Sequence, residues 1–260
     1  MNFLFEKYQG AGNDFIILDD RQESFPDHDY NLVKNICDRH YGIGADGLIL
    51  LRASNRSDFK MLYFNANGHL SSLCGNGSRC LFAYAKKNQI VDNQGTFETA
   101  DGIIKGSVTS DDLICIEMGD VLKIEKRDSA IFMDTGSPHH VEFVDQVSTV
   151  DVKSQGAAIR YGAPYFKTGS NVNFVEKVNE NEFNIRTYER GIEDETLACG
   201  TGAVAAAISA HFSKLTSLNF LTINALGGSL QVSFTQNLGQ YKNIKLTGPA
   251  VFVFSGNLNT

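Results

Sequence analysis

Two cysteines that open the same short motif are the residues best suited to chemistry. Cys74 begins Cys74-Gly75-Asn76-Gly77, and Cys199 begins Cys199-Gly200-Thr201-Gly202, at an offset of 199 − 74 = 125 residues. Each motif precedes a helix-forming run, so we expect each Cys just before a helix start, where glycines let the backbone bend and leave N–H groups uncovered. A helix N-terminus carries roughly half a positive charge, which stabilises a thiolate and binds carboxylates. Each motif therefore offers a base together with an anion cradle.

The chemistry that suits this pair is proton exchange at a carbon next to a carboxylate. Inversion of such a carbon needs one acid/base group on each face, and the duplicated motif supplies two thiols whose roles exchange with the direction of reaction. Helix N-termini would meet the negative charge that develops on the carboxylate. We find no cofactor motif and no candidate Schiff-base lysine in the sequence. A single Cys-Gly-x-Gly could equally be a turn with a buried Cys, and it is the duplication that favours the catalytic interpretation.

The run Gly42-Ile43-Gly44-Ala45-Asp46-Gly47 matches G-x-G-x-x-G. A dinucleotide site of this type needs a strand before the glycines and a helix after them. Here the order is reversed, because Leu32 to Arg39 is predicted as helix and Leu48 to Leu51 as strand. We therefore expect a loop that borders the substrate pocket.

Two further polar pairs are candidates for the site. Glu189 and Arg190 end a predicted strand ahead of the second Cys motif. Arg is suited to bidentate carboxylate binding and Glu to holding an ammonium, although a surface ion pair is the alternative. His139 and His140 are adjacent, so they point apart in an extended chain, and without a short C-x-x-C spacing no metal site is expected.

The elements around the two motifs predict an internal repeat. The offset of 125 also aligns Tyr63 with Tyr188 and Asn65 with Arg190. We therefore predict an α+β protein of two pseudo-symmetric domains, residues 1–117 and 118–260, each with strands, one central helix and further strands. The central helices are predicted at 79–87 and 203–212. Three cysteines outside the motifs are expected in the core: Cys37, Cys80 and Cys115.

The bulk composition excludes several classes of protein. The net charge is −7 with pI near 5.4, and without a Lys/Arg cluster we expect neither nucleic-acid binding nor attraction to anionic membranes. No apolar run approaches the ~20 residues of a membrane span, and no signal-peptide layout is found. Five cysteines, an odd number, disfavour a disulfide framework and favour a reducing cytoplasm.

Eight ordered motifs resemble those of the diaminopimelate epimerases over essentially the whole chain. The motifs are Gly12-Asn13-Asp14-Phe15, Gly44-Ala45-Asp46-Gly47, Tyr63-Phe64-Asn65-Ala66-Asn67-Gly68, Cys74-Gly75-Asn76-Gly77-Ser78-Arg79-Cys80, Gly136-Ser137-Pro138-His139, Asn171-Val172-Asn173-Phe174, Tyr188-Glu189-Arg190-Gly191 and Ala198-Cys199-Gly200-Thr201-Gly202.

The resemblance implies epimerisation of LL- to meso-2,6-diaminopimelate, for lysine and peptidoglycan synthesis, without a cofactor or metal. It implies two domains, each a sheet or barrel around a central helix, a final segment near Val251 to Phe254 that returns to the first domain, and a cytoplasmic homodimer. Cys74 and Cys199 would be the acid/base pair. His139 and Glu189 would adjust the cysteine pKa values. The substrate would be bound by Asn13, Asn65, Gly75, Asn76, Ser137, Asn171, Glu189, Arg190, Gly200 and Thr201, with Arg190 on the distal carboxylate.

The sequence departs from the family pattern at two positions. Asn67 stands where Asp is usual, and Ser137 stands where Asn is common, which puts one substrate contact in doubt. Two other functions stay open. A proline racemase or hydroxyproline epimerase shares the two-cysteine chemistry, but Arg190 favours a substrate with two polar ends. A binding protein that has lost the chemistry would have no need of two thiols.

Overall fold

The structure is a computed structural model that describes residues 2–71 and 74–259. The chain divides into two compact units. Unit 1 comprises Met1–Ile116 and Gly248–Thr260, and unit 2 comprises Glu117–Thr247. Residues 248–260, which the predicted boundary at residue 117 places in the second domain, therefore belong to unit 1. This is the return that the resemblance implies for Val251 to Phe254.

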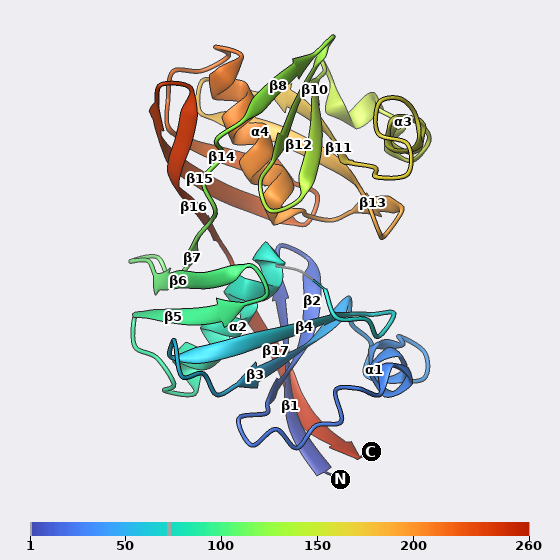
Figure 1. Ribbon diagram of the computed structural model, residues 1–260, viewed down its shortest axis with the longest axis vertical. Helices are drawn as coiled ribbons and strands as arrows, with labels where there is room; N and C mark the ends of the chain where they lie inside the picture. Colours follow the sequence, from blue (N-terminus) through green and yellow to red (C-terminus); the bar gives the residue numbers. More distant parts are fainter. Residues whose placement is uncertain (1, 72–73, 260) are drawn as a thin grey trace. The chain divides into compact units, whose positions relative to one another are not determined.

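Unit 1 is a mixed sheet built around one helix (Figure 1). Its strands pair in the order β17-β1-β2-β3-β4-β5-β6-β7, with parallel pairing only at β2–β3 and β4–β5. The elements are β1 (Asn2–Gly10), β2 (Asn13–Asp19), α1 (Tyr30–Cys37), β3 (Gly47–Arg52), β4 (Phe59–Asn65), α2 (Gly75–Lys87), β5 (Gln94–Thr99), β6 (Gly102–Val108), β7 (Ile114–Glu117) and β17 (Val251–Asn259).

Unit 2 repeats this arrangement of pairings. Its strands pair as β8-β9-β10-β11-β12-β14-β15-β16, and the parallel pairs are β10–β11 and β12–β14. The elements are β8 (Ile124–Arg127), β9 (Ala130–Asp134), β10 (Pro138–Phe143), a 3-10 turn (Val147–Thr149), α3 (Val152–Tyr161), β11 (Asn171–Lys177), β12 (Glu182–Glu189), β13 (Asp194–Thr196), α4 (Gly200–Phe212), β14 (Phe220–Ala225), β15 (Gly228–Asn237) and β16 (Gln240–Gly248).

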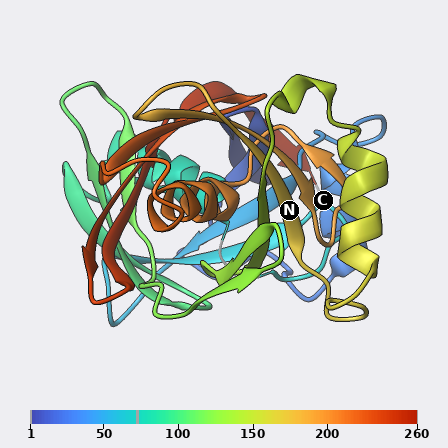
Figure 2. The ribbon, with the colours of Figure 1, turned by 90° about the horizontal axis from the view of Figure 1, so that it is seen from above.

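In each unit the second parallel crossover is the central helix. α2 joins β4 to β5 and packs against strands of unit 1 that include β1 and β2, and α4 lies between β12 and β14 and packs against strands of unit 2 that include β10 and β15. Figure 2 shows α4 along its axis with strands around it. Residues 200–210 of α4 are buried on every side, and five of them are alanine, whose small side chain lets strands approach closely. The predicted fold class is confirmed.

The central helices begin earlier than predicted. α2 starts at Gly75 and α4 at Gly200, so the Cys-Gly-x-Gly glycines are helical residues of the first turn. The helix-to-strand order around Gly42–Gly47 agrees with the prediction, since α1 ends at Cys37 and β3 begins at Gly47. Cys115 lies in β7 and is only half-buried, whereas Cys37 and Cys80 are buried as expected. Within residues 2–71 and 74–259, no helix is long and apolar enough to cross a membrane.

Candidate functional site

Cys74 and Cys199 are the N-cap residues of the two central helices. Both have extended backbone, with φ and ψ of −111° and 112° at Cys74 and −119° and 114° at Cys199. Both are half-buried. The sulfur of Cys74 accepts a hydrogen bond from the N–H of Gly77 at 3.4 Å, which is the usual capping contact of an N-cap side chain. Each thiol is therefore placed at the positive end of a helix.

The second glycine of each motif, Gly77 and Gly202, has little room for a side chain. None of the four glycines of the two motifs has a positive φ. A Cβ on Gly202 would lie 2.6 Å from Asn173 Oδ1 and 3.4 Å from Cys199 Sγ. A Cβ on Gly77 would lie 3.1 Å from the side chain of Ile49. Glycine thus lets the first turn of each helix pack directly against the sheet.

A chain of polar contacts in unit 2 leads to Cys199. His139 is completely buried on β10, and its Nε2 lies 2.9 Å from Thr201 Oγ1. Thr201 Oγ1 in turn lies 3.4 Å from Cys199 Sγ. On the other side of the ring, His139 Nδ1 lies 3.1 Å from Asn173 Nδ2.

These partners assign the tautomer of His139. Asn173 Nδ2 also donates to the carbonyl of His140 at 2.9 Å, and Asn173 Oδ1 accepts from the hydroxyl of Thr187 at 3.0 Å, so the amide can lie only one way round. Its second N–H therefore points at His139 Nδ1, which must be an acceptor. The neutral ring then carries its proton on Nε2 and donates it to Thr201 Oγ1. The hydroxyl hydrogen of Thr201 is left to donate to the sulfur of Cys199.

The electrostatics agree with a neutral imidazole. Burial lowers the pKa of His139 to about 3, and the positive charge of Arg190 adds to this effect. His140, its neighbour, points to the other face of β10, where it contacts Tyr165 and Glu142. In the described part of the chain no group of three His, Cys, Asp or Glu residues could hold a metal.

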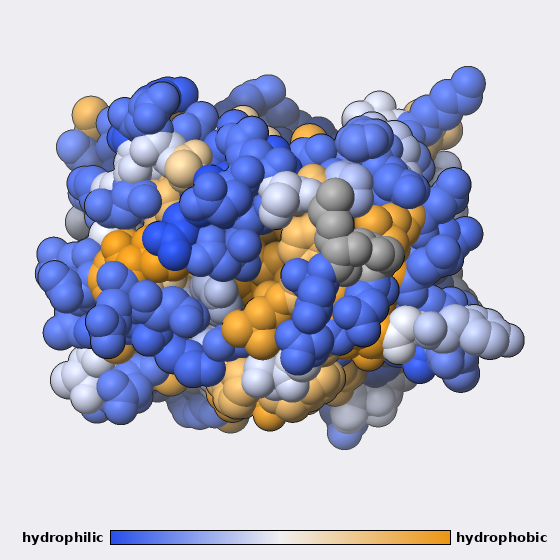
Figure 3. Space-filling view, turned by 90° about the horizontal axis from the view of Figure 1, so that it is seen from below, coloured by the Kyte–Doolittle hydropathy of each residue, from blue (hydrophilic) through white to orange (hydrophobic). Residues whose placement is uncertain are grey.

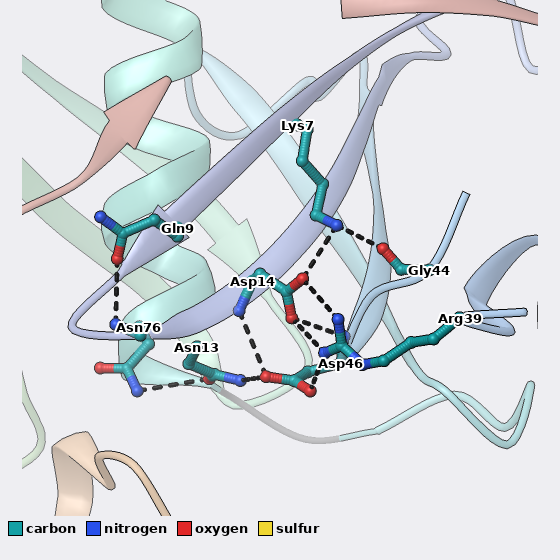
Figure 4. A network of polar contacts seen from close by, with 9 residues as sticks. Lys7, Gln9, Asn13, Asp14, Arg39, Gly44, Asp46 and Asn76 are labelled. Atoms are coloured by element: carbon teal, nitrogen blue, oxygen red, sulfur yellow. Dashed lines mark hydrogen bonds and ion pairs between the residues drawn. The ribbon is translucent and has the colours of Figure 1, made fainter. Parts of the chain in front are cut away.

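In unit 1 the corresponding polar side chain beside the thiol is Asn13, at the start of β2. Its Oδ1 lies 3.8 Å from Cys74 Sγ and accepts a hydrogen bond from Asn76 Nδ2 at 3.3 Å. Its Nδ2 donates to Asp46 (Figure 4). Asn13, Cys74, Gly75 and Asn76 are thus gathered at one place in unit 1.

Several predicted substrate-binding residues of unit 2 are joined to one another. Asn171 donates both amide hydrogens to protein oxygens, Ser137 Oγ at 2.9 Å and Pro138 O at 3.1 Å, and its Oδ1 accepts from the backbone N–H of Arg190 at 2.9 Å. Asn171 therefore holds two loops together and has no N–H left for a substrate. The guanidinium of Arg190 donates to the carbonyl of Thr168 at 2.9 Å.

The remaining predicted residues lie as follows. Glu189 ends β12 and accepts a hydrogen bond from Thr196 at 3.0 Å. Asn65 ends β4, where its N–H bonds to the carbonyl of His69. Asn67 and His69 line a polar cavity of about 570 Å³ around the start of α1, which no predicted site residue lines.

Sequence reasoning missed the supports of the site: Asn173 and Thr187 behind His139, Asp46 behind Asn13, and Arg79 behind Asn76. A signal existed for Asn173, because residues 171 and 173 lie two apart on a strand and so share a face. The cysteines outside the motifs differ from the candidates, since burial raises the pKa of Cys37 to about 12 and also raises that of Cys80. Such thiols stay protonated at neutral pH.

Solved structures with the same fold come from several enzyme families. A phenazine biosynthesis protein of the PhzF family from Bacillus anthracis superposes with a TM-score of 0.81 over 100% of both chains at 13% identity. A hydroxyproline epimerase from Agrobacterium vitis has a TM-score of 0.71, at 12% identity, over 99% of this chain and 92% of its own. At such identity these likenesses show the fold alone.

Sequence comparison is more specific. The sequence profile of the family described as diaminopimelate epimerase matches residues 5–124 and 131–253. A diaminopimelate epimerase from Flavobacterium psychrophilum is 50% identical over 95% of this chain and 97% of its own length. A diaminopimelate epimerase from Aquifex aeolicus is 38% identical over 98% of this chain and 97% of its own length. The chain therefore belongs to the diaminopimelate epimerase family, a family of isomerases.

Proposed function

We propose that this protein epimerises LL-2,6-diaminopimelate to meso-diaminopimelate by a two-cysteine mechanism without a cofactor. The observation that carries the proposal is the repeated placement of Cys74 and Cys199 as N-caps of equivalent helices in a chain of this family. One thiolate removes the proton from the reacting carbon while the other thiol, on the opposite face, delivers one. The product differs from the substrate only in the configuration at that carbon.

The first turns of α2 and α4 supply the second requirement of this chemistry. Backbone N–H groups of Gly75, Asn76, Gly200 and Thr201 lie at helix N-termini, where N–H groups have no helical partner. We assign them to the carboxylate next to the reacting carbon, whose negative charge grows as the proton leaves. Thr201 has a second role, because its hydroxyl faces Cys199 Sγ.

The other candidate residues are assigned to binding the substrate and to distinguishing it from other amino acids. Asn13 presents a fixed oxygen beside Cys74, and Arg190 is assigned to the distal carboxylate of the substrate. Asn65, Ser137 and Glu189 are assigned to the remaining polar groups. The structure supports Asn171 more strongly as a support for Ser137 and Arg190 than as a direct ligand.

The product, meso-diaminopimelate, would serve lysine and peptidoglycan synthesis in the cytoplasm.

A homodimer is part of the proposal. β17 pairs along β1, and its residues 251–254 are each at least 40% exposed although all four are Val or Phe. Leu4 of β1 is 65% exposed. Figure 3 shows apolar side chains among the polar ones on one face of the molecule. The exposed apolar residues of β1 and β17 form a surface suited to a second copy of the chain.

Solvent-deuterium exchange tests the reaction. Protein in D₂O is incubated with LL-diaminopimelate and, separately, with L-proline, and deuterium at Cα is followed by mass spectrometry together with stereochemistry. We expect uptake and inversion with diaminopimelate only. Uptake with L-proline alone would instead identify a proline racemase, and uptake with neither would leave a binding protein.

The two-cysteine mechanism needs its own controls. Cys74→Ala and Cys199→Ala are compared with Cys115→Ala, a half-buried thiol of β7 outside the helix N-termini. The first two should lose inversion, and the third should keep it. Equal losses in all three would point to a general effect of cysteine removal on the fold.

A further inference from the structure

Arg79 is a buried cation for which the described structure gives no ion pair. Its side chain is fully buried in the first turns of α2, and none of the ion pairs among residues 2–71 and 74–259 includes it. Burying an unpaired charge is costly, so its neighbours must be acceptors. One is Asn76 Oδ1, which accepts from Arg79 Nη2 at 2.8 Å, and weaker contacts reach the carbonyls of Gly75 at 3.4 Å and Pro249 at 3.5 Å.

This contact fixes the amide of Asn76. A guanidinium has only donors, so the atom of Asn76 that faces Arg79 must be the oxygen. The NH₂ group of Asn76 then faces Asn13 and donates to Asn13 Oδ1 at 3.3 Å. Arg79, Asn76 and Asn13 are thus joined by two consecutive hydrogen bonds, and the buried guanidinium determines which atom is the donor in each of them.

A carboxylate fixes the other end. Asp46 accepts from Asn13 Nδ2, and its Oδ2 also accepts from the backbone N–H of Asp14 at 3.2 Å (Figure 4). Its Oδ1 accepts from Arg39 Nη2 at 2.8 Å. An ionised carboxylate has only acceptors, so the atom of Asn13 that faces Asp46 must be its nitrogen.

Asp46 is itself held by a charged cluster. Arg39 joins Asp46 to Asp14, with 2.6 Å from Arg39 Nη2 to Asp14 Oδ1, and Lys7 Nζ lies 2.8 Å from Asp14 Oδ2. Burial alone would raise the pKa of Asp14, but hydrogen bonds from Arg39 and Lys7 and their charges lower it to about 2. Asp14 therefore stays ionised at neutral pH.

We propose that Arg79 and Asp46 are positioning residues that lock the amides of Asn76 and Asn13 so that Asn13 Oδ1, and never its NH₂ group, faces the sulfur of Cys74. The purpose of this arrangement rests on the proposed function. An acceptor beside the sulfur orients the S–H of Cys74 and favours its protonated form, the acid of the pair. It also gives the substrate an acceptor, suited to an ammonium group, at that point of the site.

Other groups act on Cys74 as well. From α2 these are the charge of Arg79, the neighbouring thiol of Cys80 and the N–H of Gly77. The charge of Arg79 and the N–H of Gly77 favour the thiolate, whereas the acceptor oxygen of Asn13 favours the thiol. The experiment must therefore reverse the donors and acceptors of the hydrogen bonds around Asn13 separately from changing the net charge beside Cys74.

Asp46→Asn is expected to reverse the donor and acceptor in the hydrogen bond between residues 46 and 13. Arg39 still requires an oxygen, so the new NH₂ group faces Asn13 and the N–H of Asp14. Asn13 then turns its oxygen toward residue 46 and its NH₂ toward Cys74 and the NH₂ of Asn76. We expect kcat/KM for diaminopimelate to fall about tenfold or more, because buried donors are left facing donors.

The exchanged double variant, Asn13→Asp with Asp46→Asn, restores the direction at wild-type net charge. The NH₂ of residue 46 now donates to a carboxylate at residue 13, whose other oxygen accepts from Asn76 and faces Cys74. Asn13→Asp alone places two carboxylates together and should be impaired. We expect the double variant to exceed both single variants, and a double variant no better than Asp46→Asn overturns the proposal.

Alkylation gives a readout that does not depend on epimerase activity. The rate of iodoacetamide labelling of the Cys74 peptide is measured against pH by mass spectrometry, with the Cys199 peptide as the internal control. In Asp46→Asn the Cys74 midpoint should move to lower pH, and in the double variant it should return to the wild-type value or above, while Cys199 stays unchanged. A Cys74 midpoint unmoved by Asp46→Asn, in protein with normal circular dichroism, overturns the proposal. If the midpoints move as expected but wild-type protein does not epimerise diaminopimelate, only the proposed function fails.

Discussion

The Nε2 of His139 lies 2.9 Å from the hydroxyl oxygen of Thr201, and that oxygen lies 3.4 Å from the sulfur of Cys199. Since the tautomer of His139 makes Nε2 a donor, the hydroxyl hydrogen points to the sulfur. Cys199 thus faces a donor, whereas Cys74 faces the acceptor oxygen of Asn13. The cysteine at the N-cap of the central helix therefore faces a hydrogen-bond donor in unit 2 and a hydrogen-bond acceptor in unit 1.

Thr201→Val should make Cys199 harder to ionise. The variant keeps the backbone N–H and the shape but removes the hydroxyl donor, worth about 1 kcal/mol, so the alkylation midpoint of Cys199 should rise by somewhat less than about one pH unit. Thr201→Ser is the control and should behave like wild type. A midpoint that is the same in Val and Ser variants would show that the hydroxyl does not donate to the sulfur.

His139→Gln should flatten the pH dependence of stability. The folded pKa of His139 is about 3, below the unfolded value of 6.5, so between these values the unfolded chain binds a proton that the folded chain does not. The neutral His139 therefore contributes its full share to the free energy of unfolding above pH 6.5, and this contribution decreases as the pH falls below that value. From pH 7 to pH 5 the wild type should lose about 2 kcal/mol more unfolding free energy than the variant, measured by urea denaturation. Parallel losses would mean that His139 is protonated in the folded state.

Cys74→Ala and Cys199→Ala should each lower kcat for epimerisation by about 10²–10⁴-fold or more, since each removes the acid/base group of one face. Thermal unfolding temperatures should stay near wild type, because both thiols are only half-buried caps. Chiral chromatography of the product gives the rate. If either variant inverts diaminopimelate at near-normal speed, that thiol is not one of the two bases.

Gly202→Ala should damage both stability and activity, although Ala is the better helix former by about 1 kcal/mol. Its methyl group would lie 2.6 Å from Asn173 Oδ1, and moving Asn173 disturbs the partner that fixes His139. We expect a loss of about 1–3 kcal/mol on unfolding. Gly119→Ala, where nothing lies within 4 Å of the new Cβ, is the matched control.

Arg190→Ala should weaken binding of diaminopimelate about ten- to a hundredfold, as expected for loss of a charge-assisted bidentate contact. A substrate analogue without the distal carboxylate should bind nearly as before. Calorimetric titration of both ligands measures the difference. Equal weakening would show that Arg190 acts through its hydrogen bond to the carbonyl of Thr168 and supports the loop instead.

The repeated Cys motif was enough to predict the two central helices, because its offset and the apolar runs after it are local signals. The crowding of Gly202 by Asn173 could not be predicted, since it is a contact between segments far apart in sequence. The same reason hid the role of Asp46, which acts on Asn13 across 33 residues. Asn171 was assigned to the substrate from its motif alone, and only the partners of its amide show that the protein uses both hydrogens.

The pairing of β17 with β1 has a consequence for synthesis on the ribosome. β1 emerges long before β17 and acquires this neighbour only when residues 251–259 have been made. Unit 2, whose residues 117–247 are continuous, has all its strands available sooner. The C-terminal half can therefore finish folding before the N-terminal half, in contrast to the usual vectorial order. Until then β1 has an open edge on that side and exposes Phe5, which packs against Phe254 in the folded protein, to other nascent chains and chaperones.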